Sequence, residues 1–303
     1  MEKVIIAVDA GGSKTKVCII NRAKEIVETF MEGAGSPAVL KEEALIHIHD
    51  GIHKALLYAR KKMEVVGLIV GVSALGVIGD VLAYQNKLEK EFQVTTKVIS
   101  DATLALYSVF TDLYQEGILV LSGTGSAVLG FKTDQMCLVG GYGHLLTEVG
   151  SAFTVVRNLI KDTIRQFETD QTFSDLSKAF MEELGFQELN QFRSFMYQNS
   201  KTHIASYARF IVKKADENDP HALRLLKEAG EDLAHDVRNA VKALNLRSPI
   251  VLGFRGGFIC NASIAKQEVI SVLEKEWEVL EVAGEQDPIY GAFYLAWRLG
   301  ILC

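Results

Sequence analysis

A β-hairpin with a glycine-rich tip is predicted twice along the chain, and this repetition constrains the fold more than any other feature. Short β-branched runs at Val4–Val8 and Lys16–Ile20 flank two consecutive glycines, which is the pattern of two strands joined by a tight turn. The runs Gly117–Leu121 and Ala127–Phe131 flank a second glycine-containing tip in the same way. A similar hairpin at the head of each half of a chain indicates a duplicated fold.

The segments outside the hairpins alternate between the helix and the strand pattern. Apolar residues recur every three or four positions over residues 41–62, which predicts an amphipathic helix. Asp219-Pro220 is an N-cap followed by proline at the first helical position, and it begins the longest predicted helix. The further predictions are strands at 65–72, 95–100 and 249–252 and helices at 82–92, 102–110 and 291–299. The fold class is therefore α/β, with one domain over residues 1–113 and a second over residues 114–303 that includes the closing helix.

The composition is that of a soluble globular protein. Apolar residues make up 49% of the 303 residues and charged residues 23%, which is enough to build a sizeable core. The formal net charge of −6 disfavours nucleic acid and anionic membranes as partners, because both attract basic patches. The longest apolar stretch, Val65–Gly79, falls short of the ~20 residues that a transmembrane helix needs. Four scattered cysteines without a C-x-x-C spacing indicate reduced thiols. We expect a cytoplasmic protein, and the sequence allows a homodimer.

The first hairpin tip has the composition of a phosphate-binding loop. Glycines let the backbone approach a ligand closely, and consecutive N–H groups form an anion-binding concavity. Asp9 ends the buried strand before this tip. A carboxylate that faces a phosphate needs a divalent cation between them, so Asp9 predicts Mg²⁺, held through water. An ordinary hairpin turn is the alternative. The candidate cofactor-binding residues of this tip are Asp9, Gly11, Gly12, Ser13, Lys14 and Thr15.

The second tip repeats the donor pattern of the first without a lysine. Two such tips could bind the β- and γ-phosphates of one nucleotide, although each alone is also compatible with a plain turn. A third glycine cluster follows the strand predicted at 249–252, and it could let a base and ribose lie against the backbone or form only a strand-to-helix turn. The candidate residues of these two segments are Ser122, Gly123, Thr124, Gly125, Gly253, Gly256 and Gly257.

Asp101 follows a buried strand and precedes a predicted helix. Aspartate is a good N-cap residue, so a capping role is one interpretation. The other is a general base that accepts the proton of a substrate hydroxyl during phosphoryl transfer. The two roles are compatible.

Taken together, the three glycine-rich segments resemble the phosphate-1, phosphate-2 and adenosine motifs of the actin, heat-shock-chaperone and sugar-kinase superfamily. Within that superfamily the chain resembles the N-acetylglucosamine kinases and the BadF/BadG/BcrA/BcrD ATPase family. The segments that carry the resemblance are Ser100–Ala102, Ser122–Ser126, Gly140–His144, Gly150–Ala152, Asn218–Pro220 and Asp287–Ala292.

The resemblance implies two ribonuclease-H-like, actin-like ATPase domains around an interdomain nucleotide cleft that holds ATP and Mg²⁺. It implies that Asp101 activates the 6-hydroxyl of an amino sugar, with N-acetylglucosamine as the expected acceptor. The residues implied to line the sugar pocket are Ser73, Gly141, Tyr142, Gly143 and His144.

The chain departs from the family pattern at two places on the acceptor side. Where these kinases read Gly-Asp-Glu-Gly-Ser, this chain reads Thr147-Glu-Val-Gly-Ser, so Glu148 takes the place of the sugar-binding aspartate. Capping of the helix that begins near Gly150 is the alternative role for Glu148. Ser36-Pro37 stands where an asparagine often contacts the sugar. N-acetylmuramic acid and glucosamine are therefore alternative acceptors. An ATPase activator of the 2-hydroxyacyl-CoA dehydratase type is the alternative function.

Overall fold

The computed structural model describes residues 1–133, 135–284 and 287–302. The chain forms two compact units. The first unit comprises Met1–Tyr114 together with the end of the chain from Ala283, and the second comprises Gln115–Val282.

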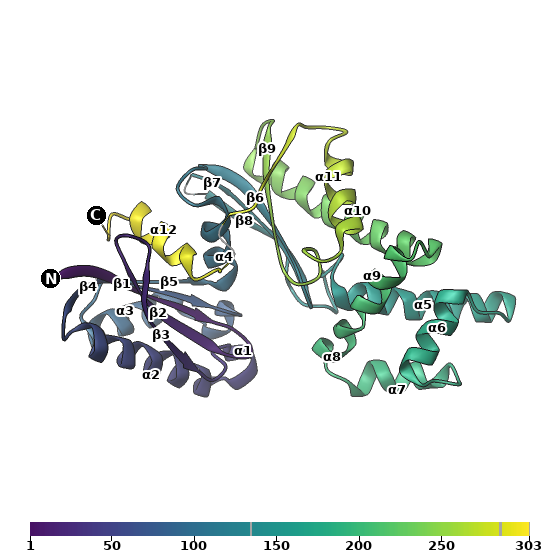
Figure 1. Cartoon of the computed structure of the whole chain (residues 1–303), viewed down its shortest axis with the longest axis horizontal. Coiled ribbons are helices and arrows are strands. Elements are labelled where there is room, and N and C mark those ends of the chain that lie inside the picture. Colours follow the sequence, from purple (N-terminus) through teal and green to yellow (C-terminus); the bar gives the residue numbers. More distant parts are fainter. Residues whose placement is uncertain (134, 285–286, 303) are drawn as a thin grey trace. The chain divides into compact units, whose positions relative to one another are not determined.

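The first unit is an α/β unit built on one sheet (Figure 1). Its strands are β1 (Glu2–Ala10), β2 (Thr15–Asn21), β3 (Ile26–Glu32), β4 (Met63–Val72) and β5 (Thr96–Ser100). Its helices are α1 (Pro37–Leu40), α2 (Glu42–Ala59), η1 (a 3₁₀ turn, Leu75–Ile78), α3 (Val81–Phe92), α4 (Asp101–Phe110) and α12 (Tyr290–Arg298).

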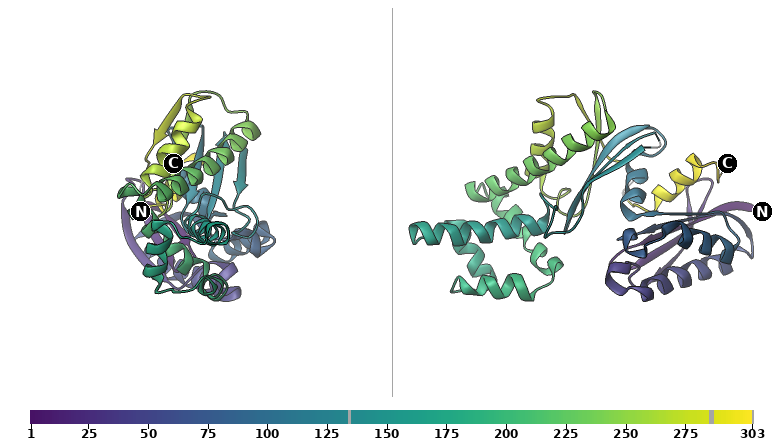
Figure 2. Two further views of the ribbon diagram at one scale, coloured as in Figure 1. Left: turned by 90° about the vertical axis from the view of Figure 1, so that its right-hand side faces the viewer. Right: turned by 180° about the vertical axis from the view of Figure 1, so that it is seen from behind.

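The second unit also has one sheet, and its helices extend beyond one end of it (Figure 2). Its strands are β6 (Glu116–Ser122), β7 (Ser126–Lys132), β8 (Gln135–Gly140), β9 (Ile250–Arg255) and β10 (Val279–Val282). Its helices are α5 (Ala152–Asp170), α6 (Asp175–Leu184), α7 (Asn190–Gln198), α8 (Lys201–Ser206), α9 (Ala208–Asp216), α10 (Pro220–Leu244) and α11 (Ser263–Leu273).

The two sheets have the same topology. Their strand orders are β3-β2-β1-β4-β5 and β10-β9-β6-β7-β8. In each, the first three strands of the unit are joined antiparallel, and the fourth runs parallel to the first. The fifth strand runs parallel to the fourth. The duplicated α/β fold predicted from the two hairpins is confirmed.

The sheet of the first unit is covered on both faces. Because side chains alternate along a strand, Val4, Ile6 and Val8 of β1 face α2 and α3, where they are buried with Ile48 and Phe92. The alternate residues of β1, Ile5 and Ala7, face α4 and α12. In the second unit one core joins β6 and β7 to α5, α10 and α11. Among the described residues, no helix is long and apolar enough to cross a membrane.

The closing helix α12 differs from its expected place. The sequence analysis assigned it to a second domain over residues 114–303, whereas it packs on the first unit. Ile289, Ala292 and Phe293 are buried there with Ile5 and Ile69 of the first sheet. The physical reason is that α12 covers the apolar face that α2 and α3 leave open.

Candidate active site

Three strands of the first sheet end at one edge and bring three predicted site residues together. Ala10 pairs with Val72 in the parallel pair β1 and β4, and Val72 pairs with Ser100 in the parallel pair β4 and β5. Asp9, Ser73 and Asp101 therefore lie at the carboxyl ends of adjacent strands. Ser73 N–H also donates to the Ala10 carbonyl at 2.9 Å, which fixes the start of the loop after β4.

The predicted first tip forms part of a cavity of about 360 Å³ in the first unit. Its backbone is closed by a hydrogen bond from Gly11 N–H to the Lys14 carbonyl at 2.9 Å. The cavity is lined by Asp9, Gly11, Gly12, Ser13, Lys14, Lys16, Asp287 and Pro288. This arrangement presents backbone and hydroxyl donors and a lysine to one space, as a phosphate site requires.

Thr15 differs from its expected place at the first tip. Its side chain is fully buried beside Ala10 and Gly35, away from the cavity lining. Its hydroxyl has no hydrogen-bond partner among the described residues. The reason is the alternation along β2, which turns Thr15 inward and Lys16 toward the cavity.

An ion pair that the sequence did not predict lies in this cavity. Lys16 Nζ pairs with the carboxylate of Asp287, which precedes α12. Asp287 belongs to a segment that carried the family resemblance, but no local pattern connects it to Lys16.

Asp9 lies in an acidic environment. Burial, together with the nearby carboxylates of Asp101 and Asp287, raises the pKa of Asp9 from 3.8 to about 6. Lys16 and Lys14 lower the pKa, but their effect is smaller. The negative charge at Asp9 is therefore only partly compensated by the protein's own groups.

The donor set fits Mg²⁺. Mg²⁺ keeps several waters and is bound by one or two carboxylates together with substrate phosphates. Asp9 provides such a carboxylate beside the tip cavity. In the described part of the chain, no group of three or more His, Cys, Asp or Glu side chains could hold a metal alone. Asp9 would therefore hold the ion together with water and phosphate oxygens.

Asp101 is the first residue of α4, and Ser100 caps this helix. The Ser100 hydroxyl accepts a hydrogen bond from Thr103 N–H at 3.0 Å, so the capping role expected for Asp101 is wrong. The Asp101 carboxylate instead accepts hydrogen bonds from Ala102 N–H at 2.8 Å and from the Ser73 hydroxyl. Burial raises the pKa of Asp101, and these bonds lower it by less. The carboxylate is thus oriented and more basic than a solvated aspartate.

In the second unit, the second tip and the third glycine cluster lie against each other. The N–H groups of Phe258 and Ile259 donate to the Ser122 carbonyl at 3.2 and 3.0 Å. Gly256 has φ +114°, and a Cβ there would collide with the Ser122 carbonyl. Only glycine allows the two backbones to approach this closely.

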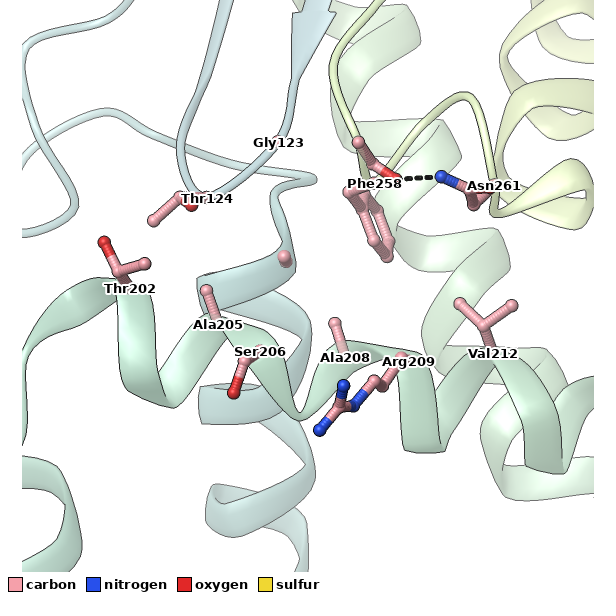
Figure 3. A pocket seen from close by; sticks show the side chains of 12 residues that line it. Gly123, Thr124, Thr202, Ala205, Ser206, Ala208, Arg209, Val212, Phe258 and Asn261 are labelled. Carbon is pink, nitrogen blue, oxygen red and sulfur yellow. Dashed lines mark hydrogen bonds between the residues drawn. The ribbon is translucent and has the colours of Figure 1, made fainter. Parts of the chain in front are cut away.

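These two segments line a cavity of about 440 Å³ in the second unit. Figure 3 shows Gly123 and Thr124 of the hairpin on one side, Phe258 and Asn261 on another, and α8 and α9 beneath them. Ala205, Ala208 and Val212 make one wall apolar, and Thr202, Ser206, Arg209 and Asn261 supply polar groups. A mostly apolar pocket with a few polar groups is typical of a site for a small organic ligand.

Four residues predicted for this site lie outside the cavity lining, and Gly256, described above, is one of them. Ser122 is buried and its hydroxyl donates to the Gly150 carbonyl at 2.7 Å. Gly253 lies within strand β9. Gly125 is not part of the cavity lining, and a Cβ there would lie 2.6 Å from Lys201 Nζ. Gly123, Thr124 and Gly257 line the cavity as expected.

The loop predicted to line a sugar pocket follows β8. Gly140, Gly141 and Gly143 have positive φ, and Tyr142 is 69% exposed. The His144 ring packs edge-on against Phe153, with 4.7 Å between the ring centroids.

Glu148 is held by Lys201 in an ion pair. The N-cap of α5 is Ser151, which forms a capping box with Thr154, so the alternative role of Glu148 as a helix cap is wrong.

The cysteines lie apart. Cys18 is buried in β2, Cys137 is half-buried in β8 and Cys260 is exposed after β9. Cys303 lies outside the described residues.

The strand order repeated in both units, with a glycine-rich tip after the first strand of each, is that of the actin-like ATPase fold. The solved structures of a candidate N-acetylglucosamine kinase from Chromobacterium violaceum and of another from Porphyromonas gingivalis have this fold. The first aligns with a TM-score of 0.68 at 18% identity, over 99% of each chain. The second aligns with a TM-score of 0.66 at 20% identity, over 96% of this chain and 98% of that one.

The chain belongs to the BadF/BadG/BcrA/BcrD ATPase family, whose model matches residues 6–296. A curated relative from Clostridium acetobutylicum, described as an N-acetylmuramic acid/N-acetylglucosamine kinase, is 25% identical over 302 residues. The alignment covers 97% of this chain and 98% of that relative. The family membership predicted from the glycine-rich segments is confirmed.

Proposed function

We propose that this protein is an ATP-dependent sugar kinase that transfers the γ-phosphoryl group of ATP to the 6-hydroxyl of an amino sugar, with N-acetylglucosamine as the acceptor. The observation that carries this proposal is Asp101, a half-buried carboxylate oriented by Ser73 and Ala102 N–H beside a phosphate-type cavity.

Asp101 acts as the general base. As the sugar oxygen forms its bond to the γ-phosphorus, the bond from phosphorus to the β,γ-bridging oxygen breaks and ADP leaves. The hydroxyl proton moves to the Asp101 carboxylate. A base of this kind contributes about 10²–10⁴-fold to the rate. The raised pKa of Asp101 strengthens the carboxylate as a proton acceptor.

Each unit offers backbone N–H groups to phosphate oxygens. In the first unit they come from the tip at Gly11–Lys14, where Asp9 would hold Mg²⁺ through water. In the second unit they come from the tip at Ser122–Ser126. When bound, Mg²⁺ neutralises charge on the β- and γ-phosphates. The apolar wall of the cavity in Figure 3 receives the adenine, with Gly257 against its face.

The residues that we assign to sugar binding are Ser73 in the first unit and Gly141–His144 in the second. The name of the C. acetobutylicum relative includes N-acetylmuramic acid, which makes this larger amino sugar the second candidate acceptor. The Ser36-Pro37 segment, which replaces an expected asparagine, is compatible with either N-acetylglucosamine or N-acetylmuramic acid as the acceptor.

The test is release of ADP from Mg²⁺-ATP in the presence of N-acetylglucosamine, N-acetylmuramic acid or glucosamine, with the product identified by mass. We expect ADP release to depend on the sugar and the product to be heavier by one phosphoryl group. ADP release that is the same with and without every sugar would refute the kinase function.

A further inference from the structure

The second tip has no cationic side chain of its own in the sequence, unlike the first tip with Lys14. The fold supplies one from a distant segment. Lys201, the first residue of α8, lies against Gly125, because a Cβ on this glycine would lie 2.6 Å from Lys201 Nζ.

Glu148 holds this ammonium group in place. The two side chains form an ion pair in which Glu148 is 10% and Lys201 27% exposed. A Cβ on Gly125 would lie 2.7 Å from the Glu148 carboxyl carbon, so both members of the pair touch the same tip. If the two side chains separated, each would keep a partly buried charge without a partner. The paired geometry is therefore the favoured one.

The helix that carries Lys201 also forms a wall of the candidate nucleotide cavity. Thr202, Ala205 and Ser206 of α8 line this cavity together with Gly123 and Thr124 of the tip. Figure 3 shows Thr124 and Thr202 on adjacent walls. Lys201 directly precedes Thr202, and its ammonium group lies beside Gly125, next to the tip residues Gly123 and Thr124 that line the cavity.

A lysine ammonium group has three hydrogen-bond donors and no acceptor. Within the second unit, Glu148 accepts from Lys201, and one such bond leaves donors for a further anion. The most strongly negative part of a nucleotide in this cavity would be its phosphate chain, which the N–H groups of a glycine-rich tip attract.

We propose that Lys201 binds the β- and γ-phosphate oxygens of ATP at the second tip, and that Glu148 is the positioning residue for Lys201 rather than a ligand of the sugar. The inference rests on the proposed nucleotide site in the second unit. It assigns to Glu148 a role on the phosphate side of the reaction.

The first test compares ATP with AMP, because AMP lacks the two phosphates that Lys201 contacts. Calorimetry with Lys201→Met should show ATP affinity lowered by about 10- to 150-fold, the range for a hydrogen bond to a charged group. AMP affinity should stay within a factor of about two of wild type. The control is Lys213→Met, which removes a 76% exposed lysine from the adjacent helix α9 and should change neither affinity.

A second variant protects the test against misfolding. Lys201→Met alone leaves Glu148 unpaired, whereas Lys201→Met with Glu148→Gln leaves no buried charge. We expect the double variant to melt close to wild type and to show the same loss of ATP affinity as Lys201→Met.

Steady-state kinetics of Glu148→Gln separates positioning from sugar binding. A positioning role predicts a higher KM for ATP with an unchanged KM for the sugar. A higher sugar KM with an unchanged ATP KM would return Glu148 to the sugar site and overturn its assignment.

The remaining outcomes are distinguishable. Equal losses of ATP and AMP affinity, or no loss of either, in the double variant would overturn the role of Lys201 while leaving the kinase intact. A wild-type protein that binds no ATP would refute the proposed function itself, and this inference with it.

Discussion

Asp9→Asn should stabilise the protein in the absence of ligands while abolishing its activity. In the folded state, burial and two neighbouring carboxylates raise the pKa of Asp9 from 3.8 to about 6. The folded state therefore binds the Asp9 proton more tightly than the unfolded state does. Between about pH 4 and pH 6 the unfolded state holds fewer protons, so the free energy of unfolding falls as the pH rises through this window. Above about pH 6 the Asp9 carboxylate is charged in both states, and its destabilising effect on the folded state is complete.

The magnitude follows from the size of the shift. About two pKa units correspond to about 3 kcal/mol, and relaxation of the site reduces this to about 1–3 kcal/mol. Asparagine has nearly the same shape and carries no charge. At pH 7.5, without Mg²⁺ or nucleotide, Asp9→Asn should therefore raise the Tm by about 2–8 °C. At pH 4.5 the difference should shrink to about a third of this, because Asp9 is then protonated in the folded state but still largely ionised in the unfolded state.

Melting curves of both proteins at pH 4.5, 6 and 7.5 measure this difference directly. Asp112→Asn, which changes an exposed aspartate, is the matched control and should leave the Tm unchanged. Mg²⁺-ATP should raise the Tm of wild type more than that of Asp9→Asn, because the ion relieves the same charge. A variant that melts below wild type at pH 7.5 would refute the argument that Asp9 carries uncompensated charge.

Three further substitutions test the site. Asp101→Asn should lower kcat by about 10²–10⁴-fold with the ATP KM nearly unchanged. In wild type, kcat should fall as the pH drops through the raised pKa of Asp101. A variant that keeps a tenth of wild-type turnover would show that Asp101 is not the base. Among the described residues, a Cβ at Gly12 would contact only Val39, 4.0 Å away, so Gly12→Val should fold normally and raise the ATP KM. An unchanged ATP KM would show that the first tip does not bind the phosphates. Gly256→Ala should lower the free energy of unfolding by about 1–3 kcal/mol and weaken ATP binding, because residue 256 has φ +114° and a Cβ there would collide with the Ser122 carbonyl. A fully stable variant with normal ATP affinity would contradict the close approach of the second tip and the third glycine cluster.

Local patterns predicted the elements that bury a regular set of residues. Helix α10 begins at the proposed Asp219-Pro220, where the Asp219 side chain accepts from His221 and Ala222 N–H. The strands β3, β8 and β10 were not predicted. Their residues are mostly half-buried or exposed, because they lie toward or at the sheet edges, so their sequences carry little of the apolar pattern that identifies a strand.

In the candidate site, too, the residues that belong to a local sequence pattern could be predicted and the others could not. Gly11, Gly12, Gly123 and Gly257 could be predicted because a glycine-rich turn after a strand is a local signal, and the structure places all four on cavity walls.

The ion pairs of Lys16 with Asp287 and of Lys201 with Glu148 could not be predicted from local patterns. Each joins side chains that are far apart in the sequence and meet only through the tertiary fold. Thr15 was misplaced because the alternation of β2 begins at this residue rather than after it.

The most direct test of the account is the identity of the product formed from Mg²⁺-ATP and N-acetylglucosamine, determined by phosphorus–proton correlation spectroscopy for wild type and Asp101→Asn in parallel. The account predicts that wild type forms the 6-phosphate of the sugar and that the variant forms the same product at a rate lower by about 10²–10⁴-fold. Inorganic phosphate as the only phosphorus product besides ADP, with N-acetylglucosamine and with N-acetylmuramic acid alike, would contradict it.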